Sequence, residues 1–259
     1  GRCGASRGDV IMVKPGHAET ISTATAMAWD VAGVAIIGLG YGSLRPTFTL
    51  DTIAGATITV SVANVAVQNM IFVANFADVA TCFTVTTATD FAVEYCEFRD
   101  TSATLNFINI VDTNATNNAA DGLYFAYNRI ISLGTTAATT AIEVDANISR
   151  MAVNDNFYVG AVVNNTPALI EAATFDMTSL EVARNIVYRQ NTDTATGGWL
   201  LEGSTVASTG MVYDNKGKTL DTAGILIMTT GSTLGFTNNL VSGLADASGF
   251  LIPAADTDA

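Results

Sequence analysis

The sequence predicts an all-β solenoid, a parallel β-helix that runs through the whole chain. Three observations support this prediction. A short frame of residues recurs about every 28 residues, each repeat carries short runs of alternating apolar and polar residues, and no stretch has helical periodicity. A repeat of this length is also too short for units of strand, helix and strand. We therefore expect residues 1–259 to form one elongated domain of about eight coils.

The repeating frame is clearest at residues 210–216, where an alternating apolar strand ends two positions before Asn215. Earlier copies put Cys96 and Met70 in the slot that Asn215 occupies. Successive slots lie 26, 32, 28, 29, 30 and 24 residues apart, which places insertions in loops between coils. The slot residues are Met70, Cys96, Asn128, Asn156, Asn185, Asn215 and Asn239.

The first coils precede this regular part of the chain. A strand is expected over residues 9–13, ending at Lys14-Pro15-Gly16, and another over 34–37, ending at the glycine cluster 38–42. That cluster lacks the glycine spacing of a dinucleotide-binding loop, and no helical pattern follows it. It therefore predicts a turn between two coils.

From Pro46 onward each repeat contains the frame strand and a second alternating run, and a third short strand follows the slot. Runs of four to six residues with a period of two bury one face only. The second runs lie at residues 82–85, 107–110, 141–144, 168–171, 199–202 and 225–228. The expected shared core comprises Phe83, Val85, Val93, Ile142, Val144, Val153, Ile170, Val182, Leu201, Val212 and Phe236.

The asparagine slot predicts a sharp turn and a ladder. Among residues with a side chain, asparagine is one of those that most readily take a left-handed backbone conformation, so we expect a left-handed or bridge-region conformation in the slot itself. Stacked coils would place the five asparagines about 4.8 Å apart, with amides hydrogen-bonded from coil to coil. These residues are Asn128, Asn156, Asn185, Asn215 and Asn239.

Composition excludes several classes of function. The net charge is −13 with only 11 Lys+Arg, which argues against nucleic-acid binding, and no apolar run is long enough to span a membrane. Cys3, Cys82 and Cys96 show no metal-site spacing, so Cys82 and Cys96 are expected to be buried apolar residues. Because the sequence begins Gly1-Arg2-Cys3, we expect that the natural N-terminus is missing from it.

Three N-terminal segments carry a family resemblance. Residues 8–16 (GDVIMVKPG), 34–40 (VAIIGLG) and Arg45-Pro46 resemble the opening coils of pectin-lyase-like right-handed β-helices. Within that superfamily the chain looks most like β-helical structural proteins of tailed bacteriophages. The resemblance implies a virion protein such as a decoration, fibre or spike component, commonly trimeric, with other virion proteins as partners and a surface glycan as a possible ligand.

Polysaccharide lyases and hydrolases share this fold, so an enzyme remains the alternative. The strongest candidate site is a file of Glu143, Glu171 and Glu202, predicted at one outward position on three consecutive coils. In the same alignment Asn109 and Met228 lie above and below the file, and Asp145 follows Glu143 on the same face. Stacked carboxylates raise at least one pKa or bind a cation, so these glutamates are candidate Ca²⁺ ligands; a solvated acidic stripe is the other interpretation.

Few other residues could complete an active site. Arg150, Arg184 and Arg189 could approach the file, but no local motif links them to it, and His17 is the single histidine. Trp29 and Trp199 are the only tryptophans available for sugar stacking. We therefore predict a non-enzymatic structural protein on the surface of a virus particle, with no catalytic residue and no cofactor.

Overall fold

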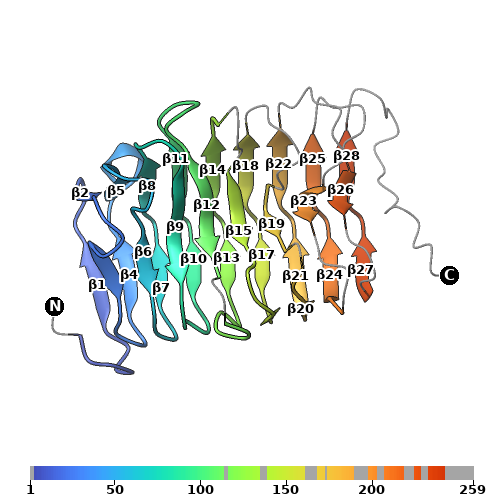
Figure 1. Ribbon diagram of the computed structural model, residues 1–259, viewed down its shortest axis with the longest axis horizontal. Coiled ribbons are helices and arrows are strands. Elements are labelled where there is room, and N and C mark those ends of the chain that lie inside the picture. The colour runs from blue at the N-terminus through green and yellow to red at the C-terminus, as the bar shows by residue number, and fades with distance from the viewer. Residues whose placement is uncertain are drawn as a thin grey trace.

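In the computed structural model the chain is a parallel β-solenoid, and each coil contributes one strand to each of three long sheets (Figure 1). The structure describes residues 3–113, 116–134, 139–160, 168–172, 174–189, 198–202, 207–218, 225–228 and 233–242. The only helix in these ranges is the short 3-10 segment η1 (Gly42–Leu44), and none could cross a membrane. The predicted all-β solenoid of about eight coils is confirmed: strands β1 to β26 contain eight successive sets with one strand from each long sheet.

Sheet A contains the frame strands that precede the slot. All its neighbours pair in parallel, and the register brings equivalent frame residues together, as in Val93 beside Val67 and Phe125. Its strands are β1 (Val10–Val13), β4 (Ala35–Gly38), β7 (Ala66–Gln68), β10 (Ala92–Glu94), β13 (Tyr124–Ala126), β17 (Ala152–Asn154), β21 (Leu180–Ala183), β24 (Thr209–Tyr213) and β27 (Thr233–Thr237).

Sheet B follows the slot in every coil and contains the predicted third strands. Its strands are β2 (Ala18–Ile21), β5 (Thr47–Leu50), β8 (Ile71–Ala74), β11 (Glu97–Asp100), β14 (Arg129–Ser132), β18 (Phe157–Gly160), β22 (Ile186–Arg189), β25 (Lys216–Lys218) and β28 (Leu240–Ser242).

Sheet C contains the second alternating runs. A separate two-stranded sheet, β16 (Ile148–Ser149) with β20 (Met177–Thr178), bridges two of the connections that lead from sheet C back to sheet A. The strands of sheet C are β3 (Met27–Trp29), β6 (Ile58–Val60), β9 (Val79–Val85), β12 (Phe107–Asp112), β15 (Thr140–Glu143), β19 (Ile170–Glu171), β23 (Gly198–Glu202) and β26 (Ile225–Met228).

The interior is one continuous apolar column. Every predicted core residue is buried except Phe236, which is partly buried and packs against the column near its C-terminal end. Aromatic rings stack along the column from coil to coil, with centroids 5.8 Å apart for Phe48 and Phe72 and 5.3 Å apart for Phe72 and Phe98. Cys82 and Cys96 are buried and free, as predicted, and burial raises the pKa of the Cys96 thiol to about 12. Burial of such side chains is the main favourable contribution to folding.

The asparagine ladder is present and buried. In each step the side-chain Oδ1 accepts a hydrogen bond from the backbone N–H of the slot residue one coil earlier, as from Asn156 N to Asn185 Oδ1 at 2.9 Å. The side-chain Nδ2 donates to a carbonyl of the preceding frame strand, as from Asn185 to Val153 O at 2.7 Å. The file runs without a break from Asn239 to Asn128, whose Oδ1 accepts from Cys96 N at 2.9 Å.

The prediction of a left-handed backbone in the slot is wrong by one residue. Positive φ angles occur at the residue before each slot, for example 57° at Tyr127 and 56° at Arg184. The turn is made one residue early, and this leaves the slot asparagine free to point inward and bond to its neighbours. A left-handed conformation costs roughly 1–2 kcal/mol for residues such as tyrosine and arginine, so the packing and hydrogen bonds of the corner must offset that cost at Tyr95, Tyr127 and Arg184. The residues at this turn position are Asn69, Tyr95, Tyr127, Asp155, Arg184, Asp214 and Asn238.

We predict that Asn185→Ala lowers the free energy of unfolding by about 1–3 kcal/mol, because it leaves buried groups such as the Val153 carbonyl and the Asn156 N–H without partners. The measurement is chemical denaturation followed by circular dichroism. Asn75→Ala is the matched control, since Asn75 bonds to Asp51 at a partly exposed position where water can replace the amide. An equal loss of stability in both variants would contradict a special role for the ladder.

Candidate functional site

The acidic file on sheet C is aligned as predicted. Glu143 pairs in register with Glu171, Glu171 pairs with Glu202, and Met228 follows Glu202 on the next strand. The side chain of Glu202 lies outside the described residues, so only its strand position is known. The predicted neighbour on the other side of the file is wrong: Asp112, and not Asn109, pairs with Glu143.

The error at Asn109 has a structural cause. Strand β12 continues two residues beyond the run that the sequence pattern marks, and β15 pairs with its C-terminal part, where Asn109 lies beside Thr140. Asn109 still contacts the file, because its Nδ2 donates a hydrogen bond to Glu143 Oε2. One oxygen of Glu143 therefore accepts a hydrogen bond from a buried amide.

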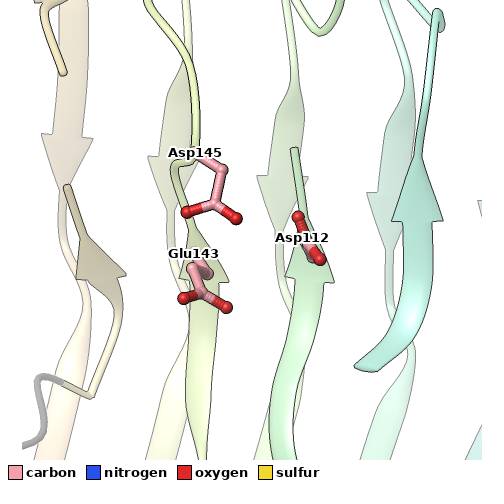
Figure 2. A group of neighbouring side chains, drawn as sticks. All are labelled: Asp112, Glu143 and Asp145. Atoms are coloured by element: carbon pink, nitrogen blue, oxygen red, sulfur yellow. The ribbon is translucent and has the colours of Figure 1, made fainter. Parts of the chain in front are cut away.

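Three carboxylates converge at this point. Oxygen atoms of Asp112, Glu143 and Asp145 all lie within 4.8 Å of one another (Figure 2). Asp112 ends β12 and Glu143 ends β15, while Asp145 is exposed just beyond that strand. The structure thus groups Glu143 with Asp112 and Asp145, and Glu171 lies on the next coil.

The environment of Glu143 favours its protonated form. Burial, followed by the negative charges of Asp145, Asp112 and Glu171, raises the pKa of Glu143 from 4.5 to about 7. Among the described residues, neither Glu143 nor Asp145 forms a salt bridge with a cationic side chain. Such a cluster could hold a proton near neutral pH or supply oxygen ligands to a hard divalent cation.

Two of the three arginines proposed to approach the file, Arg150 and Arg184, form salt bridges elsewhere. Arg184 forms a salt bridge with Asp155 at 2.8 Å on the turn between sheets A and B, and Arg150 pairs with Asp90 at 3.2 Å. The side chain of Arg189 lies outside the described residues, as does that of Trp199. His17 is near Glu19 in the first coil, with 3.5 Å between its Nε2 and the carboxylate. None of the described basic residues completes an acid–base pair with Glu143.

A buried charge cluster on sheet B was not predicted from the sequence. Glu97 is 3% exposed and forms salt bridges with Arg45, Arg99 and Arg129. Burial alone would raise the pKa of Glu97, but hydrogen bonds from Arg99 and Arg45 bring it below its usual value. Glu97 directly follows the slot residue Cys96, a position where other coils have Arg129, Phe157 or Ile186, so no repeated pattern reveals it.

Two tyrosines form an exposed stack beside this cluster. Tyr95 and Tyr127 occupy the left-handed turn position on neighbouring coils, and their rings are nearly parallel with centroids 4.8 Å apart. They are 52% and 44% exposed. Both tyrosines directly precede a slot residue, Cys96 or Asn128, so the alignment of the repeats could have placed them on neighbouring coils.

We predict that removing the Glu143 charge stabilises the protein at high pH. Between about pH 4.5 and 7 the folded chain retains a proton that the unfolded chain has released, so stability falls as pH rises through this window. Glu143→Gln should therefore be about 1–2 kcal/mol more stable than the wild type at pH 8, after allowance for solvent screening, and equally stable at pH 4.

The measurement is thermal or urea unfolding of dilute protein, so that contacts between copies do not contribute. Glu94→Gln on sheet A, where Glu94 bonds to Gln68, controls for the loss of one negative charge from the chain. A stability difference that does not change between the two pH values would contradict the assigned environment of Glu143.

Comparison with protein-family models, with curated proteins and with solved structures finds no match to this chain.

Proposed function

We propose that this chain is a non-enzymatic structural component of a virus particle, of the decoration, fibre or spike type. The observation that carries the proposal is the uninterrupted interior, in which the asparagine ladder and the stacked phenylalanines tie each coil to the next. Such a rod resists bending and local opening, because every coil between the two ends pairs with a coil on each side. These properties suit a protein exposed on a particle surface.

The resemblance of residues 8–16, 34–40 and 45–46 to phage β-helices supplies the virion part of the proposal. Among the described residues, no arginine, lysine or histidine forms a salt bridge with Glu143, and this favours the structural role over an enzymatic one. The proposed location is the outer surface of the particle, with other virion proteins as partners.

The virion role predicts where the gene lies and where the protein is found. We expect capsid and portal genes beside the coding sequence, and we expect mass spectrometry of purified particles from that genome to detect peptides of this chain. A neighbourhood of carbohydrate-utilisation genes, together with particles that lack the chain, would contradict the proposal.

A polysaccharide-degrading enzyme is the second candidate, and one observation favours it. The pKa of about 7 at Glu143 is suited to a general acid at neutral pH, with Asp112 and Asp145 nearby as carboxylates. We expect no turnover when the chain is incubated with polygalacturonate, alginate and bacterial surface polysaccharides, with and without Ca²⁺.

The measurement for this candidate is the appearance of unsaturated or reducing sugar ends. Turnover that is lost in Glu143→Gln or Glu171→Gln but kept in Glu94→Gln would establish an enzyme and overturn the structural proposal. Glu94 is the matched control because it lies on sheet A, away from the acidic file.

A further inference from the structure

The outward face of sheet B is basic and apolar, although the chain as a whole carries a net charge of −13. Arg99 and Arg129 are 43% and 55% exposed, and three arginines share the single carboxylate of Glu97. From β5 to β25, Glu97 is the only acidic residue at the outward positions of the described strands. Phe157 and Ile186 continue this face and are 40% and 45% exposed.

The outward face of sheet C has the opposite charge. Asp112, Glu143 and Glu171 follow one another in register, with Asp145 exposed beside them. No strand of sheet C contains a lysine or an arginine. The two faces are therefore complementary in charge within one chain, but they belong to different sheets of the solenoid.

The opposite charges also lie at the same height along the solenoid. Arg99 and Asp112 belong to the coil made of β10, β11 and β12, and Arg129 and Glu143 belong to the next coil, made of β13, β14 and β15 (Figure 1). A rotation about an axis parallel to the solenoid keeps every coil at its own height. Copies related by such a rotation would therefore bring Arg99 to the level of Asp112, and Arg129 to the level of Glu143.

We propose that sheet B of one copy docks side by side on sheet C of a second copy, with the solenoids parallel, so that Arg99 and Arg129 meet Asp112 and Glu143. The contact joins two different surfaces and repeats around the rotation axis, which closes a ring of identical copies. Phe157 and Ile186 would form the apolar part of the contact, and the charged pairs would set its register. This contact goes beyond the proposed virion role and does not depend on it.

The test uses light scattering and sedimentation of the full chain, whose protomer mass is 26.9 kDa. We expect a closed oligomer, a trimer in the simplest case, that dissociates as salt is added because the charged pairs are screened. Arg129→Glu and Glu143→Arg should each weaken association at least about tenfold, since each places like charges opposite one another. The double variant Arg129→Glu/Glu143→Arg should restore it, because the swap recreates the pair at every contact in the ring.

Arg150→Glu is the matched control, because Arg150 is 58% exposed and pairs with Asp90 away from both faces. This variant changes the net charge of the chain by the same amount as Arg129→Glu, and it should not weaken association. Circular dichroism and Tm of each variant establish that the solenoid itself is folded, and Arg129→Gln provides a milder change at the same position. A wild-type chain that stays monomeric, or single variants that assemble like the wild type, or a double variant that fails to recover, would each overturn the proposal.

Discussion

The bond from one slot asparagine to the next is the interaction on which the rest of the structure depends. A parallel solenoid must turn sharply between sheets A and B in every coil, and the turn leaves inward-facing backbone groups that strand pairing does not reach. A single amide satisfies two of them at once, as Asn185 does for the Asn156 N–H and the Val153 carbonyl. The ladder also fixes the height of each coil relative to the next. Between Asn128 and Asn239 this fixed height supports the strand register, including the register that aligns Glu143 with Glu171. In the earlier coils, stacked phenylalanines such as Phe48 and Phe72 connect one coil to the next.

Basic side chains are concentrated on the outward face of sheet B and acidic side chains on the outward face of sheet C. Most of the partly buried carboxylates and guanidinium groups lie on outward positions and form local clusters. Asp100 is buried at an inward position, where it accepts hydrogen bonds from the backbone N–H groups of Phe107 and Leu133. On sheet B the carboxylate of Glu97 is neutralised within the chain, since it has three arginine neighbours and a lowered pKa, and the cluster keeps a net positive charge. On sheet C like charges are grouped, and Glu143 responds by holding its proton to a higher pH. The same repeat geometry thus produces opposite electrostatic environments on two faces, because register aligns whatever residues the coils present.

Much of this architecture could be predicted from the sequence, because the repeats can be aligned with one another and equivalent positions occupy equivalent places in successive coils. Spacing of the slot residues located the coils, and alternation located the core residues from Phe83 to Val212, all of which are buried. Details that depend on where a strand ends could not be predicted. Asp112 was missed as the neighbour of Glu143 because β12 continues two residues beyond the alternating run that the sequence shows, and β15 pairs with this longer strand. The left-handed residue was placed one position late because Tyr127 and Arg184 have no intrinsic preference for that conformation and take it only under tertiary constraint.

The left-handed residue of each corner lies one position before the slot, and this position can vary in sequence without a change of fold. From Asn128 onward the slot asparagine supplies the inward side-chain hydrogen bonds of the corner. The residue before it has the left-handed backbone, and its side chain is exposed or half-buried in each coil. The chain places asparagine, tyrosine, aspartate and arginine at this position without altering the fold. The corner therefore presents a row of side chains spaced by the distance between neighbouring strands. Substitutions in this row can change the chemistry of the surface one residue at a time, while the interior that stabilises the solenoid stays the same.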